Sequence, residues 1–194
     1  LLISAPCAYA LSRFKFFYNK ALTNILVLFL SIPQIMVVLP LYSIAVEYDL
    51  LNKRITLLFL YICLNVPFCT FFLLNFFATL SRTFEEAAAV DGCTPIKTFF
   101  KIMLPLAQPG IITVGIFPFV NIWNEFFISM IFATSSDVRP LAYGLYSLIQ
   151  AMSTTGSWAE LFASVMIVVI PTFILYLFLS EKIIAGVTGG GVKE

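Results

Sequence analysis

Acidic side chains that could take part in a site are concentrated in one short stretch. Residues 85–110 read EEAAAVDGCTPIKTFFKIMLPLAQPG, so Glu85, Glu86 and Asp91 lie among alanines, with Gly92 directly after the last acid. Such carboxylates could pair with the basic groups of a partner or cap helix ends. They do not suit catalysis, because the chain has no histidine and no Ser/His, paired-acid or metal-ligand set accompanies them. The sequence therefore indicates a non-catalytic protein.

The other groups with reactive potential also lack a recognisable pattern. The four cysteines show no C-x-x-C spacing and are expected to pack as free thiols. They are Cys7, Cys63, Cys69 and Cys93. A phosphate-binding loop would need G-x-x-x-x-G-K-[ST], but Val192 follows Gly191 where the lysine should stand. We expect no metal site and no cofactor bound by this chain.

Composition places these residues in a membrane. Apolar residues make up 61% of the chain and charged residues 11%, and the mean hydropathy is +1.01. A soluble domain is nearer half apolar and a quarter charged. The net charge is +1 and no basic tract is present, which gives no support for nucleic-acid binding. The predicted fold class is all-α, a polytopic transmembrane helix bundle.

Four apolar segments have the length of about 20 residues that a helix needs to cross a bilayer. They are residues 24–46, 55–80, about 108–134, and 160–180. Residues 1–12 are too short to span, and we expect them to be the end of a further span whose beginning is missing. Residues 140–159 are rich in Gly, Ser and Thr and are expected to form a loop or a partly inserted hairpin. Each span contains proline, which indicates bending, either ordinary or around a pathway.

Lysine and arginine give the orientation. Eight of the eleven basic residues fall in the odd-numbered segments between spans, which include residues 81–107 and the tail at 181–194. Cytoplasmic loops carry the excess of these residues. We therefore expect the acidic stretch and the tail to face the cytoplasm and the loops at 47–54 and 135–159 to face outward.

Local signals predict two short helices in the acidic stretch. Thr83 and Glu86 match a capping box, and Gly92 stands where a helix ends in a left-handed residue. Thr94 and Pro95 are typical of the start of a second helix. This helix–bend–helix presents a small-residue face on which another surface could dock, although a plain connecting loop with solvating acids remains open.

The spacing of this stretch resembles the EAA loop of the permease subunits of binding-protein-dependent ABC importers. The matching positions are Glu86-Ala87-Ala88, Gly92, Ile102 and Leu104-Pro105. Three further segments resemble the carbohydrate branch, whose members transport maltose and other oligosaccharides. They are Ala8-Tyr9-Ala10-Leu11-Ser12-Arg13-Phe14, Trp123-Asn124-Glu125-Phe126, and the tail Gly186-Val187-Thr188-Gly189-Gly190-Gly191-Val192-Lys193. The resemblance covers nearly the whole chain. It implies the type I importer permease fold, truncated at its N-terminal end to four full spans plus part of another.

The resemblance also implies roles and partners. Glu86 would pair with a basic group on a cytoplasmic ATPase, Ala87 and Ala88 would allow close approach, Gly92 would supply the bend, and Asp91 would cap or pair locally. Glu85, Leu104 and Pro105 complete the implied coupling surface. The implied partners are a second homologous permease, two ATP-binding subunits that carry ATP and Mg, a solute-binding protein outside, and the bilayer of a prokaryotic cytoplasmic membrane. The tail would reach the ATPase or be a free end.

A second candidate site lies near the outer end of the third full span. Glu125 is the one acid within an apolar run, and intramembrane acids are functional candidates by default. Together with Asn121, Trp123 and Asn124 it could stack on sugar rings and bond to their hydroxyls. The alternative is that Glu125 caps or bridges helices while Trp123 anchors at the interface.

Two other functions are consistent with parts of the sequence. The same scaffold could import another solute, such as an amino acid, phosphate or glycerol phosphate, which the EAA loop does not distinguish. A secondary transporter or channel would predict inverted repeats and an ion-binding residue at the midplane, and the sequence shows no repeat. We therefore expect an importer permease for sugars.

Overall fold

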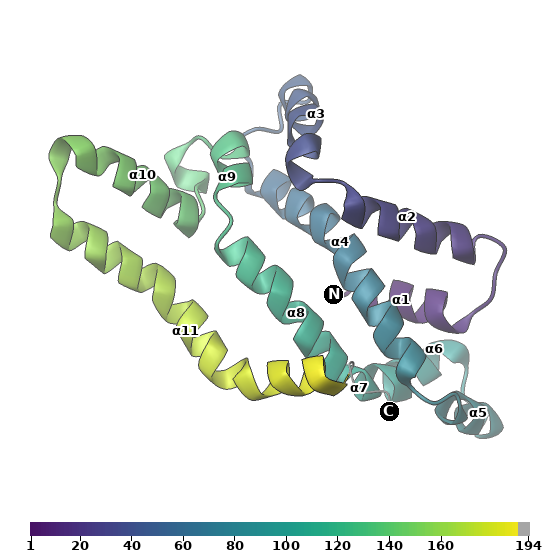
Figure 1. Cartoon of the computed structure of the whole chain (residues 1–194). Coiled ribbons are helices and arrows are strands. Elements are labelled where there is room, and N and C mark those ends of the chain that lie inside the picture. The colour runs from purple at the N-terminus through teal and green to yellow at the C-terminus, as the bar shows by residue number, and fades with distance from the viewer. Residues whose placement is uncertain (190–194) are drawn as a thin grey trace. The chain divides into compact units, whose positions relative to one another are not determined.

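The computed structural model describes the backbone of residues 1–189 and the side chains of residues 1–152 and 156–178. Secondary structure in these residues consists of helices, with no strand, which confirms the predicted all-α class (Figure 1). The described chain divides into two compact units. Unit 1 contains residues 1–32, 64–117 and 182–189, and unit 2 contains residues 33–63 and 118–181.

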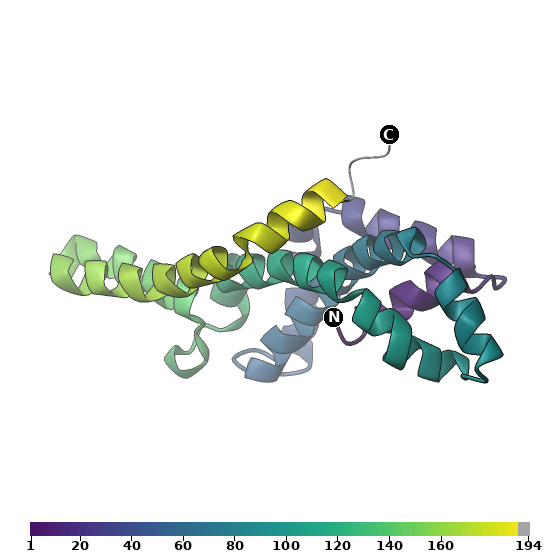
Figure 2. The ribbon, with the colours of Figure 1, turned by 90° about the horizontal axis from the view of Figure 1, so that it is seen from below.

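Unit 1 carries the acidic stretch. Its elements are α1 (Ser4–Arg13), α2 (Asn19–Ser31), the second half of α4 (Arg54–Thr79), α5 (Thr83–Val90), α6 (Pro95–Thr98), a π-helical turn (Phe99–Met103), α7 (Leu104–Leu106) and most of α8 (Gln108–Trp123). Helix α5 and the segment that begins with α6 are the two arms of a hairpin next to the end of α4 (Figure 2). We call residues 83–98 the acidic hairpin.

The core of unit 1 joins α1, α4 and the π-helical turn that follows the acidic hairpin. Leu73 and Phe77 on α4 are fully buried, as is Met103 in the π-helical turn. Residues four apart lie on one face of a helix, which explains how Leu73 and Phe77 form one stripe. Ala5 and Ala8 are among the buried residues of α1, and such small residues let two helices approach closely in a membrane.

Helices α4 and α8 also approach closely within unit 1. A Cβ atom added at Gly110 would lie 2.5 Å from Cγ of Phe76. Only glycine fits this position without displacing the ring. The Phe68 and Phe117 rings meet edge to face, 5.9 Å apart, farther along the same pair of helices. The lack of a side chain at Gly110 thus allows the first turn of α8 to pack directly against Phe76 of α4.

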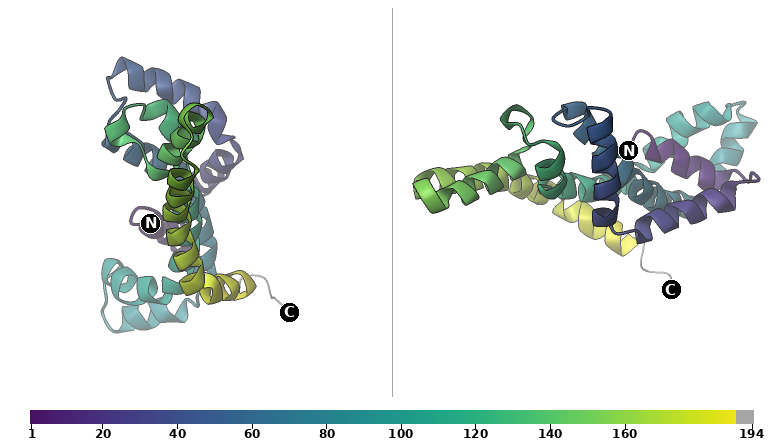
Figure 3. Two further views of the ribbon diagram at one scale, coloured as in Figure 1. Left: turned by 90° about the vertical axis from the view of Figure 1, so that its left-hand side faces the viewer. Right: turned by 90° about the horizontal axis from the view of Figure 1, so that it is seen from above.

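Unit 2 carries the second candidate site. Its elements are α3 (Gln34–Glu47), the first half of α4, the end of α8, α9 (Phe127–Phe132), a 3-10 turn (Ser136–Val138), α10 (Leu141–Thr155) and α11 (Trp158–Gly189) as far as residue 181. Helices α10 and α11 run in opposite directions on either side of the bend at Gly156 (Figures 1 and 3). The Tyr42 ring of α3 meets Phe132 of α9 edge to face at 6.0 Å.

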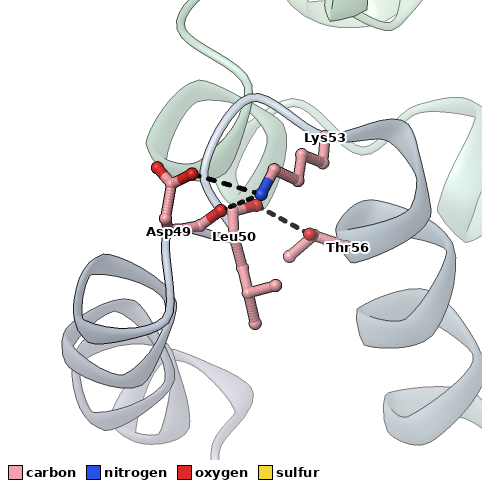
Figure 4. Close-up of polar contacts among 4 residues, drawn as sticks. All are labelled: Asp49, Leu50, Lys53 and Thr56. Carbon is pink, nitrogen blue, oxygen red and sulfur yellow. Dashed lines mark hydrogen bonds and ion pairs between the residues drawn. The ribbon is translucent and has the colours of Figure 1, made fainter.

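The turn between α3 and α4 is closed by its own polar groups. Asp49 and Asn52 have φ angles of 51° and 57°, a left-handed conformation that short polar side chains tolerate. The Thr56 hydroxyl donates to the Leu50 carbonyl at 2.7 Å. The Lys53 ammonium contacts the Asp49 carboxylate at 3.3 Å and its carbonyl oxygen (Figure 4).

Asn52 then joins this turn to the segment after α9. Its backbone N–H donates to the Phe132 carbonyl at 2.9 Å. Its Oδ1 accepts hydrogen bonds from the Ser135 amide at 2.8 Å and the Thr134 hydroxyl at 3.0 Å. The two loops expected on the outer side are therefore tied together by one side chain.

Among the residues that the structure describes, two helices are long and apolar enough to cross a membrane, or up to four if each of two bent pairs is one span. The long helices are Arg54–Thr79 and Trp158–Phe178, which correspond to the segments expected at 55–80 and 160–180. The segment 24–46 is not one helix. Helix α2 ends at Ser31, and the next two residues, Ile32 and Pro33, are extended. Proline disfavours helical geometry in the residue before it, which explains the break.

The segment expected at 108–134 is also interrupted. Helix α8 ends at Trp123 and α9 begins only at Phe127. Before α8, the chain from Pro95 to Leu106 meets it at 73°. The chain therefore bends at Ala107, where Pro109 enters the first turn of α8.

One expectation about a loop is wrong. Residues 140–159 were expected to form a loop or hairpin, but Leu141–Thr155 is the helix α10. Its apolar residues recur at helical spacing, and this periodicity outweighs the Gly, Ser and Thr content. The tail expected at residues 181–194 begins within α11, which continues to Gly189. The remaining tail residues, 190–194, lie outside the described residues.

Candidate functional site

The acidic hairpin bends at Gly92 as the sequence predicted. Gly92 has a φ of 73°. Its amide donates to the Ala89 carbonyl at 3.1 Å, and the Cys93 amide donates to the Ala88 carbonyl at 2.9 Å. This pair of bonds is a Schellman motif, which ends a helix with a left-handed residue, usually glycine. The turn between the two arms is thus fixed by backbone hydrogen bonds.

The second arm of the hairpin begins with the cap that the sequence predicted, and the first arm does not. The Thr94 hydroxyl accepts a hydrogen bond from the Lys97 amide at 3.4 Å, and Pro95 occupies the first turn. The capping box at Thr83 is wrong, because Thr83 is already helical and the preceding Arg82 makes no side-chain cap. The Glu86 amide bonds to the Arg82 carbonyl at 3.0 Å. The Glu86 side chain is consequently not occupied in capping Thr83.

The two neighbouring acids have different surroundings. Glu86 is exposed, and its side chain makes no hydrogen bond or ion pair within the described chain. Glu85 points toward α1, where its Oε1 lies 3.3 Å from Nε of Arg13. Only 20% of the Glu85 side chain is exposed. Successive residues of a helix face directions about 100° apart. Glu85 therefore faces α1 and pairs with Arg13, while the neighbouring Glu86 faces away and is exposed.

The predicted coupling residues divide in the same way. Glu86, Ala87, Asp91 and Gly92 are exposed. Ala88 is 2% exposed and faces inward with Glu85. Among the later positions, Leu104 is half-buried against the core of unit 1, and Pro105 is exposed. The hairpin therefore presents a compact accessible surface around Glu86 and Ala87, and the remaining residues attach it to unit 1.

Sequence reasoning missed two features of this surface. Val90 is 88% exposed and Ile96 is 72% exposed, one on each arm of the hairpin. These two side chains add apolar surface to the exposed part of the hairpin. Arg13 was also missed as a contributor, although a cation at the end of an apolar helix needs a partner. The signal was present, because Arg13 lies in a segment already singled out for its resemblance.

The second candidate site is built around Glu125 in unit 2. Its Oε2 accepts a hydrogen bond from the Tyr61 hydroxyl at 2.8 Å. Its carboxylate also accepts from the Ile128 amide at 2.5 Å and the Ser129 amide at 3.2 Å. Those two amides belong to the first turn of α9, where N–H groups have no intrahelical partner. Glu125 thus caps α9 and joins it to α4.

The other candidate pathway residues differ in whether their side chains contact a neighbouring helix. Trp123 donates from Nε1 to the Val168 carbonyl of α11 at 3.0 Å, and its ring is stacked on Phe119. The Asn124 side chain donates to the Val120 carbonyl of α8 at 2.8 Å. Asn124 is exposed, as is Asn121. Trp123 and Glu125 therefore hold neighbouring helices, and the two asparagines are accessible.

Comparison with known proteins identifies the family of this chain. The family described as "Binding-protein-dependent transport system inner membrane component" matches residues 1–185. The sulfoquinovosyl glycerol transport system permease protein of Agrobacterium fabrum is 34% identical, with 100% of this chain and 67% of that protein covered. The trehalose/maltose transport system permease protein of Thermococcus litoralis is 33% identical, with 98% and 68% covered.

A further relative and a solved structure extend the comparison. The diacetylchitobiose uptake system permease protein NgcG of Streptomyces coelicolor is 32% identical, with 98% of this chain and 63% of that protein covered. The crystal structure of a bacterial ABC transporter involved in the import of the acidic polysaccharide alginate matches with a TM-score of 0.73 at 24% identity. That match covers 93% of this chain and 68% of the other and shows a shared fold. The chain spans about two thirds of the length of these proteins.

Proposed function

The chain belongs to the family of inner membrane components of binding-protein-dependent transport systems, and from that premise we propose that it is a permease subunit of an ATP-driven importer for sugars. It forms the translocation pathway with a second permease in the cytoplasmic membrane of a prokaryote. It hydrolyses no ATP itself. Two separate subunits bind ATP and Mg, and a solute-binding protein delivers the sugar from outside.

One observation carries the proposal for coupling to the ATPase. Glu86 and Ala87 are exposed on the acidic hairpin, while Glu85 and Ala88 attach the same helix to unit 1. An accessible carboxylate on a firmly attached short helix suits an ion pair with a basic group of a partner. The exposed Val90 and Ile96 would add apolar contacts on either side of it.

The proposed substrate class rests on the relatives. Their names include transport of sulfoquinovosyl glycerol, trehalose and maltose, and diacetylchitobiose, all of them sugars or sugar derivatives. For this chain we propose an oligosaccharide or a related glycoside. Within the pathway, Asn121 and Asn124 are the residues that could bond to hydroxyl groups, because Trp123 and Glu125 are engaged by neighbouring helices.

The coupling proposal is tested by replacing Glu86 in the complete transporter in proteoliposomes. Glu86→Ala should reduce ATP-dependent uptake by about 5- to 150-fold, the range of a typical coupling free energy of about 1–3 kcal/mol. Glu160→Gln is the matched control, because Glu160 is an exposed acid in the first turn of α11. Uptake of a panel of labelled oligosaccharides and ATP hydrolysis are measured at equal amounts of assembled complex. Wild-type uptake by the Glu86→Ala transporter would contradict the proposal.

A further inference from the structure

Arg13 is a nearly buried cation at the C-terminal end of α1. Only 6% of its side chain is exposed. Its Nη2 donates a hydrogen bond of 2.7 Å to the Leu80 carbonyl, directly after the last residue of α4. Its Nε lies 3.3 Å from Oε1 of Glu85, which is in the first turn of α5. One guanidinium therefore joins the ends of three helices.

The charges match the helix ends that they meet. The C-terminal ends of α1 and α4 carry partial negative charge and favour a cation, and the N-terminal end of α5 favours an anion. The contact between Arg13 and Glu85 is a close charge pair without aligned hydrogen-bond geometry. If either residue moved away alone, the other would be left charged in a largely buried position, which is strongly unfavourable.

Tyr9 adds to the same connection one turn earlier on α1. Its side chain interacts with the Glu85 carboxylate. Its ring lies 5.5 Å from Phe77 of α4 and 5.0 Å from Phe99, which begins the π-helical turn after the acidic hairpin. Helix α1 thus contacts α4, the first arm of the acidic hairpin and the π-helical turn that follows the hairpin.

Helix α5 has few other attachments. It is eight residues long, and a helix of this length is marginal without tertiary contacts. Of its eight residues, Ala88 is buried, Glu85 is half-buried and the remaining six are exposed. The orientation of α5 therefore depends on Ala88, on the turn at Gly92 and on the pair formed by Glu85 and Arg13.

We infer that Arg13 is a positioning residue which makes α5, α1 and the end of α4 move as one body. A displacement that a partner imposes at Glu86 then reaches α1 and α4 through Glu85 and Leu80. This inference rests on the proposed function of the acidic hairpin, because it concerns the step that follows docking.

The test measures the distance between α1 and α5 by electron paramagnetic resonance in the complete transporter in nanodiscs. One spin label is attached to Cys7, which is an exposed native cysteine of α1, and the other to Val90→Cys, with the remaining cysteines replaced. Arg13→Gln and Glu85→Gln are compared with Lys15→Gln, a matched control at an exposed cation two residues beyond α1. ATP is the probe, and each complex is first checked for bound ATPase subunit.

We expect the distance to be the same with and without ATP in the parent protein and in Lys15→Gln. In Arg13→Gln and in Glu85→Gln, ATP should shift or broaden the distance distribution, because α5 moves without α1. The double variant should behave like either single variant, since the two residues act as a pair. If Arg13→Gln does not assemble, Glu85→Gln decides the outcome.

Two results would overturn the inference. One is an ATP-independent distance in both single variants. The other is a broadening that is equal with and without ATP, which would show a purely structural role. Failure of the proposed function looks different, because the mobility of the Val90→Cys label in the parent protein would then be insensitive to the presence of the ATPase subunit.

Discussion

Replacing Gly92 tests whether the left-handed turn holds the acidic hairpin together. No atom lies within 4 Å of a Cβ built at Gly92, so an added methyl group meets no neighbour. The cost of Gly92→Ala therefore comes from the backbone alone. At a φ of 73°, that cost is about 1–2 kcal/mol for an ordinary L-residue. Gly92→Asn should cost less, because asparagine adopts this conformation more readily.

Amide hydrogen exchange measures this cost where it acts. The amides of residues 92 and 93 form the Schellman bonds to the carbonyl groups of Ala89 and Ala88. If opening of the turn limits exchange, a cost of 1–2 kcal/mol corresponds to exchange about 5- to 30-fold faster at these amides in Gly92→Ala. The peptide containing the turn is followed by mass spectrometry in detergent or nanodiscs, and a peptide from α10 serves as the internal control.

The exchange rates of the two variants together show whether backbone conformation limits the residue at position 92. Exchange in Gly92→Asn should lie between that of the parent protein and that of Gly92→Ala. Equal exchange in Gly92→Ala and the parent protein would show that the turn does not need its left-handed residue. A larger effect in Gly92→Asn than in Gly92→Ala would show that side-chain size, and not backbone conformation, limits this position.

Three further predictions concern unit 2. Glu125→Ala should lower the free energy of unfolding by about 0.5–2 kcal/mol, the usual value of a helix N-cap, with Glu125→Gln intermediate in thermal unfolding of the purified protein. Asn52→Ala should be less stable than Asn52→Gly in the same assay, because both lose the side-chain bonds and only alanine strains the φ of 57°. Hydrogen bonds from its own backbone amide and from neighbouring serines lower the pKa of Asp137. Since a lowered carboxyl pKa stabilises the fold above the unfolded-state pKa, its contribution should be constant near neutral pH and lost only as the pH falls through the folded-state pKa, which NMR of the loop can follow.

The parts of the fold that the sequence predicted are those set by composition and local turn chemistry. The apolar runs at 55–80 and 160–180 correspond to long helices, and Gly92, Thr94 and Pro95 have the backbone roles that their residue types favour. Hydropathy did not locate the breaks at Ile32–Pro33 and after Trp123. Both lie inside apolar runs, where breaking a helix leaves the mean hydropathy unchanged.

The candidate site shows the same limit. The sequence identified the stretch with Glu85 and Glu86 but not which acid is free. That difference depends on Arg13, which is far away in sequence and meets Glu85 only after α1 packs on α4. For Glu125, the sequence left pathway and capping open, and the contacts with Tyr61 and α9 establish the capping role.

The most direct test of the central proposal is photocrosslinking from the exposed face of the acidic hairpin. A benzoylphenylalanine residue replaces Ala87 in the assembled transporter, and a control protein carries it at Trp158, which is 67% exposed on α11. We predict that position 87 forms a crosslink to the ATP-binding subunit and that position 158 does not. A transporter that imports its solute with ATP but gives no crosslink from position 87 to that subunit would contradict the account.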